Sequence, residues 1–212
     1  MKKKIAKLDK PRILELYIEL ETTPKVWRKF LIDDSSSMYE LHEIIQVVMG
    51  WMNSHLFMFR IAGLVIAEPS PNADDDWREV EFKDARRVKV SQILEKPGDT
   101  MPYEYDFGDS WDHTLRLERV VDESEVMFSV PRCVAGENAC PPEDCGSFPG
   151  FENLKEVISD PENEEYERMI HWLDQYYPNY DPTEFSLGAV NKILKIGASK
   201  FLKLAPTFYA GE

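Results

Sequence analysis

The sequence predicts an α+β protein with a largely antiparallel β-sheet packed with helices and a helical C-terminal portion. Apolar residues alternate with polar ones in several short segments before about residue 132, as in strands with one buried face. Apolar residues at helical spacing dominate residues 151–203 instead. Strands that come first and helices that come last favour an α+β fold over a doubly wound sheet. With 212 residues and no internal repeat, we expect a single domain over residues 1–212.

The strands are read from alternation and from the turns between them. Every second residue from Leu14 to Leu20 is Leu or Ile, which indicates a half-buried strand, and a second strand follows the turn at Pro24. Ala62-Gly63 separates two short apolar runs, as in a hairpin. The predicted strands span residues 12–20, 26–32, 55–61, 64–67, 101–107, 111–121 and 125–132.

The helices are read from their caps and their spacing. Ser37 and Glu40 form a capping box before an amphipathic segment that ends at Gly50. Asp160-Pro161 is expected to start a later helix. The predicted helices span residues 37–50, 91–95, 151–159, 162–177 and 187–202, and loops are expected at 69–77 and 134–150.

The charge of the chain argues against a role in binding DNA. The net charge is −14, but basic residues concentrate at the two ends. Residues 13–190 carry 15 Lys and Arg against 37 Asp and Glu, a net charge of −22. Proteins that bind DNA present cations to the phosphate backbone, so we expect only weak duplex binding without sequence preference.

Composition also limits the compartment and the role of the cysteines. The basic start MKKKIAKLDKPR lacks the apolar segment of a signal peptide, so a cytoplasmic protein without a membrane span is expected. Cys133, Cys140 and Cys145 do not have the spacing of a zinc ribbon or finger, and buried thiols are the favoured interpretation.

The stretch YEYDFGDSWDH, residues 103–113, holds four acids and no Lys or Arg. A three-residue loop at 108–110 would pair Tyr105 with His113 and give one continuous apolar face. Asp106 would then lie opposite Asp112 on the other face, beside Asp109 at the turn. Like charges across a ladder are mildly destabilising, so these carboxylates indicate either a functional site or a solvated hairpin tip.

Several motifs resemble those of the plasmid pRiA4b ORF-3-like family, whose members are also described as insertion-element passenger proteins and sometimes labelled TnpR. They cover most of residues 12–190. The matching residues are Pro24, Val26-Trp27-Arg28, Leu41-His42, Ile45-Gln46, Met49-Gly50-Trp51, His55-Leu56, Phe59, Tyr105 to Asp109, Trp111, His113, Cys140 to Gly146 and Gly150. Ser147 departs from the family, where a second glycine is usual. The resemblance implies a shared α+β fold and brings no established activity.

The resolvase label does not fit the residues. A serine recombinase needs a nucleophilic Ser among clustered arginines that hold the scissile phosphate, and the sequence has no such cluster. We therefore expect no recombinase chemistry.

The favoured interpretation is a binding or interaction module for a protein or small-molecule ligand, with a groove built from the YDFGDSWDH hairpin and the CPPEDCG loop. The candidate binding residues are Trp27, Arg28, His42, Trp51, His55, Tyr105, Asp106, Asp109, Trp111, Asp112, His113, Glu143 and Asp144. Histidines within apolar patterns are more often hydrogen-bonded core residues than ligands, and tryptophans more often core than ligand platforms.

The alternative is a metal-assisted hydrolase, in which a divalent metal is held by carboxylates and histidines. It requires that several of Asp106, Asp109, Asp112, His113, Glu143 and Asp144 converge on one point.

Both interpretations predict that the acidic hairpin and the CPPEDCG loop meet in space. Their mutual repulsion would be relieved by a cation, for example Arg28, or by raised carboxylate pKa values. Replacing Asp106 or Asp109 by Asn is then expected to leave stability unchanged or to raise it.

Overall fold

The structure is a computed structural model that describes residues 12–69 and 80–209, with side chains up to Leu204. The residues outside these ranges include the basic residues that precede Arg12 and all of the predicted loop at 69–77 except its first residue, and thus also Trp77. In the part of the chain that is described, no helix is long and apolar enough to cross a membrane.

One eight-stranded sheet runs through the molecule, in the order β5-β4-β3-β6-β7-β1-β2-β8. All neighbouring pairs are antiparallel except β4 and β5, so the predicted α+β class with a largely antiparallel sheet is confirmed. The strands are β1 (Ile13–Leu20), β2 (Val26–Asp33), β3 (Phe57–Ile61), β4 (Leu64–Ala67), β5 (Glu81–Asp84), β6 (Thr100–Tyr105), β7 (Trp111–Val121) and β8 (Arg132–Glu137).

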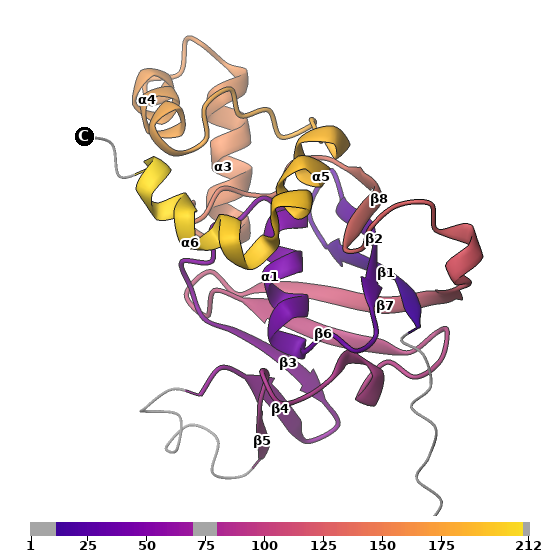
Figure 1. Cartoon of the computed structure of the whole chain (residues 1–212). Helices are drawn as coiled ribbons and strands as arrows, with labels where there is room; N and C mark the ends of the chain where they lie inside the picture. The colour runs from indigo at the N-terminus through magenta and orange to yellow at the C-terminus, as the bar shows by residue number, and fades with distance from the viewer. Residues whose placement is uncertain (1–11, 70–79, 210–212) are drawn as a thin grey trace, which may run out of the picture.

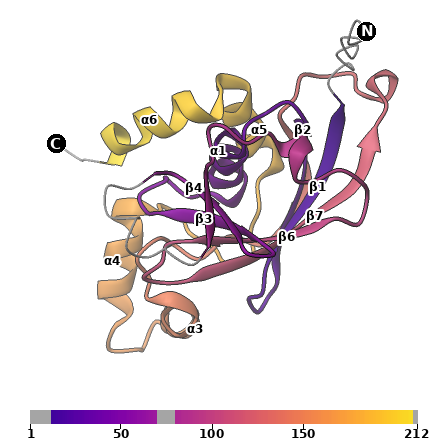
Figure 2. The same ribbon diagram turned by 90° about the horizontal axis from the view of Figure 1, so that it is seen from below.

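The helices are α1 (Met38–Met49), α3 (Ser147–Ser159), α4 (Tyr166–Tyr176), α5 (Leu187–Ile196) and α6 (Ala198–Tyr209), with short 3-10 turns at Val90–Gln92 and Glu123–Glu125. Helices α3 to α6 gather at one end of the molecule, away from β4 and β5 (Figure 1), whereas the N-terminal end of α1 lies next to the chain that follows β5. Helix α1 contacts α5 and α6, and α5 also contacts β8. Figure 2 shows α6 and α1 on one side of β3 and β6, while α3 and α4 lie beside each other on the opposite side in that view.

A continuous apolar core joins most of these elements, with the exception of α4 and β5, and extends from Leu14 to Leu202. The alternation read in the first strand is observed, because Leu14, Leu16, Ile18 and Leu20 are fully buried. The capping box of α1 is also observed, with the Ser37 hydroxyl accepting from the Glu40 amide and the Glu40 carboxylate accepting from the Ser37 amide. Sequence-local signals therefore located the most regular elements.

Several predicted elements differ from the structure. The helix expected at 91–95 is a 3-10 turn at Val90–Gln92, and the loop expected at 134–150 contains most of β8 and the first turn of α3. The strand expected at 125–132 is instead β8, Arg132–Glu137, because these residues pair with the distant strand β2. Strand β5 was not predicted. The helix expected at 187–202 is two helices, because Gly197 adopts φ 106° between them. The helix expected from 162 begins at Tyr166, after turns that follow Asp160.

Candidate functional site

The acidic hairpin has a five-residue loop rather than the predicted three-residue loop. Tyr105 pairs with Trp111 and Tyr103 pairs with His113, so the predicted pairing of Tyr105 with His113 is wrong by two residues. The predicted face is correct nevertheless, because Tyr105 and His113 are both buried on one side of the hairpin. Asp106 causes the difference: it leaves the strand at φ 58°, and its Oδ1 accepts from the Gly108 amide at 2.9 Å.

The like charges that face each other across the ladder are Glu104 and Asp112, not Asp106 and Asp112. Asp112 is exposed, whereas Glu104 is buried and accepts from Arg60. Burial raises the pKa of Glu104, and the positive charge of Arg60 opposes that rise. The repulsion between Glu104 and Asp112 is therefore relieved within the protein, without a ligand.

Asp109 joins the hairpin to the CPPEDCG loop. Its Oδ2 accepts from the Gly146 amide at 3.2 Å, and its backbone oxygen accepts from the Ser147 hydroxyl at 2.7 Å. Gly146 caps the N-terminus of α3, where a carboxylate is favoured by the helix dipole. The structure thus brings the hairpin and the loop together, as expected from the sequence.

A second contact between hairpin and loop passes through His55. Its Nε2 lies 3.3 Å from Asp144 Oδ1 and 3.6 Å from Asp106 Oδ2. The three ligand atoms lie within 4.8 Å of one another. Among the described residues, His55 Nε2 has no hydrogen-bond partner, and it is shielded from solvent. Asp106 is nearly buried, whereas the side chain of Asp144 is 73% exposed, so the cluster lies at the protein surface.

Glu143 forms a buried polar centre next to this cluster. Its carboxylate accepts from the hydroxyl groups of Tyr105 and Ser54 and from the Met52 amide. Its own amide donates to the Tyr177 hydroxyl oxygen at 2.8 Å. Burial first, and then the charge of Glu143, raise the pKa values of Tyr105 and Tyr177 well above the ordinary range, so both phenols stay neutral. Glu143 thus anchors the loop to the sheet and to the chain after α4.

Two pockets open between the CPPEDCG loop and α4, and they share Asp144 and Trp172 in their walls. We call them together the α4 groove. The first, of about 290 Å³, is lined by Asp144, Cys145, Gly150, Asn153, Leu154, Arg168, Met169 and Trp172. The second, of about 340 Å³, is lined by Met52, Ser54, Glu143, Asp144, Trp172, Tyr176 and Tyr177. Within the described residues, no side chain of the hairpin 103–113 lines either pocket, so the hairpin does not form the groove wall that was expected.

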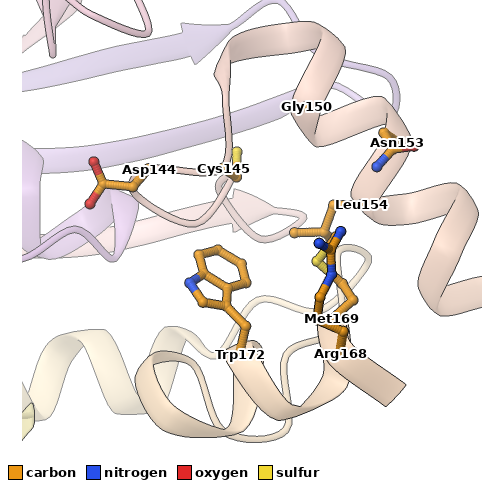
Figure 3. Close-up of a pocket in the computed structure, with 8 residues that line it drawn as sticks. All are labelled: Asp144, Cys145, Gly150, Asn153, Leu154, Arg168, Met169 and Trp172. Atoms are coloured by element: carbon orange, nitrogen blue, oxygen red, sulfur yellow. The ribbon is translucent and has the colours of Figure 1, made fainter. Parts of the chain in front are cut away.

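Figure 3 shows how the first pocket is built. The Trp172 indole reaches from α4 toward the backbone at Asp144 and Cys145, and Met169 faces Leu154 of α3. The carboxylate of Asp144 points away from Leu154, out of this pocket. One end of the groove is therefore mainly apolar, and its other end reaches the acidic loop.

Several candidate residues are core residues instead. His42 is fully buried, with Nδ1 2.8 Å from the Tyr103 hydroxyl and Nε2 2.6 Å from Asn53 Oδ1. Burial lowers the pKa of His42 to about 3 and that of His113 to about 4. Both are neutral at physiological pH and neither lies in the acidic cluster.

The tryptophan candidates and Arg28 also lie outside the groove. Trp51 and Trp111 are buried, and Trp27 stacks on Tyr17 away from the loop. Arg28 is buried and donates to four backbone oxygens, those of Trp27, Val48, Glu137 and Asn138. Its guanidinium cannot relieve the repulsion between the carboxylates, contrary to the expectation. Its charge is instead spread over carbonyl dipoles and the face of Phe185 at 3.9 Å.

The cysteines are free thiols, with Cys133 and Cys140 buried and Cys145 partly buried. Burial raises their pKa values to about 11 for Cys133 and about 12 for Cys140 and Cys145. These thiols are weak nucleophiles at neutral pH, which agrees with the interpretation as packing residues.

Sequence reasoning missed the part played by α4. Trp172, Tyr176 and Tyr177 line the groove, although tryptophans were expected to be core residues more often than ligand platforms. The signal in the sequence was the run HWLDQYYPNY, residues 171–180, in which four aromatic residues cluster at the end of a predicted helix.

The fold and the site define an α+β protein in which a His-Asp-Asp cluster lies beside a groove lined by aromatic residues. The chain belongs to the plasmid pRiA4b ORF-3-like protein family, whose profile matches residues 12–189. It is 30% identical over 195 residues to "Uncharacterized protein y4hQ" of Sinorhizobium fredii (strain NBRC 101917 / NGR234), which covers 91% of this chain and 96% of that protein.

A solved structure shares the fold. It is titled "Crystal Structure of Protein of Unknown Function MM3350 from Methanosarcina mazei Go1", and it matches with a TM-score of 0.69 and 29% sequence identity. The match covers 84% of this chain and 97% of that chain. These relatives share the family and the fold, and their names assign no activity.

Proposed function

We propose that the protein is a binding module and that the α4 groove takes a small organic molecule with a flat apolar part. The observation that carries this proposal is the pair of adjoining pockets, about 290 and 340 Å³, that share Trp172 and Asp144. Pockets of this size fit small molecules, which generally occupy a few hundred cubic ångströms. A protein partner would instead need a broad surface on each side.

The walls of the groove favour such a ligand. Trp172 is partly exposed and offers an aromatic face at the junction of the two pockets, while Leu154 and Met169 supply apolar contact opposite it. Asp144 borders both pockets and Ser54 lines the second, so both can orient a polar group of the ligand. A ligand whose flat part stacks on Trp172 and whose polar group reaches Asp144 would use both ends.

A neutral, flat, solvatochromic dye such as Nile red tests the proposal without knowledge of the natural ligand. The full-length protein is expected to bind one equivalent, with a blue shift of the dye emission. Trp172→Ala should weaken binding about tenfold through the loss of the stacking face. The matched control is Trp27→Ala, because Trp27 is also partly exposed but lies outside the groove.

Two outcomes would contradict the proposal. One is a folded protein that leaves the dye emission unchanged. The other is an equal loss of affinity in both Ala variants, which would place the dye outside the α4 groove.

A further inference from the structure

We infer that His55, Asp106 and Asp144 form a binding site for one divalent transition metal ion, with Zn²⁺ the best match and Mn²⁺ the next. The inference extends the proposed function, because Asp144 also lines the α4 groove. It does not depend on that function, since the metal site stands on its own ligand geometry.

The separations between the ligand atoms fit a metal better than they fit hydrogen bonds. A histidine that donates to a carboxylate lies about 2.7–2.9 Å from it. The observed separations from His55 Nε2 are longer, at 3.3 Å to Asp144 and 3.6 Å to Asp106. Zinc–ligand bonds of about 2.0–2.2 Å in a tetrahedron place neighbouring ligand atoms about 3.4 Å apart. Both observed separations are close to that value, and the third is at most 4.8 Å.

The ligand atoms are oriented by contacts that leave them free to bind. Asp106 Oδ1 accepts from the Gly108 amide, so Oδ2 is the oxygen that faces His55. The backbone amide of His55 donates to the Tyr105 hydroxyl at 3.3 Å, and the two rings pack edge to face. Support of this kind by residues around the ligands fixes the geometry of known metal sites.

The unpartnered atom of the cluster is the imidazole nitrogen, the most selective of the three ligands. His55 Nε2 is shielded from solvent and has no hydrogen-bond partner among the described residues, although it is directed between two carboxylates. A buried polar atom without a partner is unfavourable, and coordination would remove that penalty.

Ligand type selects the metal. One imidazole and two carboxylates suit Zn²⁺ or Mn²⁺, whereas Ca²⁺ needs six to eight oxygen ligands. Glu143 is close in sequence, but its oxygens already accept from Tyr105, Ser54 and Met52. Three protein ligands leave at least one coordination position open, as in zinc sites that bind a substrate. Because Asp144 is exposed and borders the groove, a carboxylate or phosphate oxygen of a groove ligand is the chemistry that would complete the coordination.

Isothermal titration of the EDTA-treated, dialysed full-length protein with ZnCl₂ tests the inference. One equivalent is expected to bind, and substitution by Co²⁺ should give the intense visible bands of tetrahedral coordination. His55→Gln, Asp106→Asn and Asp144→Asn should each weaken binding tenfold or more. Asn at 106 can still accept from the Gly108 amide, and position 144 is exposed, so these variants are expected to fold.

Matched controls separate this site from other ligands on the chain. His171→Gln removes an exposed histidine of α4, and Asp112→Asn removes an exposed carboxylate of the hairpin; both should bind zinc like the parent protein. Cys145→Ser should also retain binding, which excludes the thiol next to Asp144 as the ligand.

The inference is overturned if zinc binds only at millimolar concentration, or if His55→Gln binds as tightly as the parent. The first result would leave an ion pair between His55 and the carboxylates as the role of the cluster. Nile red binding to the metal-free protein is measured in parallel. If the protein binds the dye but no metal, the proposed function stands and the metal site is refuted. If it binds the metal but not the dye, the metal site stands and the proposed function is refuted.

Discussion

The two buried histidines predict a steep loss of stability at mildly acidic pH. His42 and His113 have folded-state pKa values of about 3 and about 4, because burial disfavours their charged forms. In the unfolded chain their pKa values return to about 6.5, so the unfolded state takes up protons first as the pH falls. The stability that is present above about pH 6.5 is therefore lost progressively as the pH falls below that value.

The magnitude follows from the unfolded-state pKa, since both side chains remain neutral in the folded state at pH 5. Each histidine then lowers the free energy of unfolding by about 2 kcal/mol between pH 8 and pH 5, and the two together by about 4 kcal/mol. Arg86 also lowers the pKa of His42, whereas the rings of Trp51 and Tyr103 pack against His113. Other groups, such as Glu43 and Glu104 with raised pKa values, change stability in the opposite direction.

A variant comparison cancels those other groups. His113→Phe keeps an aromatic ring against Trp51 and Tyr103 but removes the titrating group and its contact with the Tyr103 carbonyl. It is expected to lower stability by about 1 kcal/mol at pH 8 and to reduce the loss between pH 8 and pH 5 by about 2 kcal/mol. Urea unfolding of both proteins at each pH, with EDTA present, measures this difference.

The exposed His171 provides the control, because His171→Gln should leave the pH dependence unchanged. The reasoning is refuted if His113→Phe loses as much stability as the parent between pH 8 and pH 5. That result would mean that His113 can be protonated within the folded protein.

Three further predictions concern Glu143, Asp109 and nucleic acid. Tyr105→Phe removes the hydroxyl that donates to the buried Glu143, so it should lower the free energy of unfolding, measured in urea, by about 2–3 kcal/mol. The control Tyr176→Phe, at an exposed position, should change the free energy of unfolding little. Equal stability of the two variants would contradict this prediction. Asp109→Ala removes the carboxylate that accepts from the Gly146 amide at the start of α3, and thermal melts should show a loss of stability of about 1 kcal/mol. Asp112→Ala is the control and should show no such loss. If Asp109→Ala is as stable as the parent protein, the contact between Asp109 and Gly146 does not stabilise the fold. A labelled DNA duplex should bind only weakly and without sequence preference in a fluorescence titration at physiological salt, because the body of the chain is strongly acidic; tight, sequence-dependent binding would overturn this.

The hairpin shows why faces are easier to predict than register. A shift of two residues returns every side chain to the same face, so three-residue and five-residue loops give the same buried set. The apolar pattern therefore placed Tyr105 and His113 correctly but could not choose their partners. The choice depends on the Asp106 carboxylate accepting from the Gly108 amide, a local contact that the alternation of residues does not encode.

The candidate site shows a related division. His55, Asp106, Asp109 and Asp144 were named from the sequence, and the structure brings them together. Arg28 was named with them as a cation that could relieve the repulsion between the carboxylates, yet it is buried among backbone carbonyls. Tertiary contacts decide whether a polar residue stabilises the fold or is available to a ligand. The chemical type of the residue alone does not determine this.

The acids of YEYDFGDSWDH can now be assigned one by one. Glu104 pairs with Arg60, Asp109 accepts at the start of α3, and Asp112 faces solvent, so three of the four have ordinary structural surroundings. Asp106 differs, because one of its oxygens holds the turn while the other is directed at an imidazole nitrogen without a hydrogen-bond partner. The high acidic density of the hairpin is therefore not itself the functional signal. Asp106 Oδ2 and its two neighbours from distant parts of the chain make up the proposed metal site, so the zinc titration of the Asp106→Asn variant is the most informative single measurement.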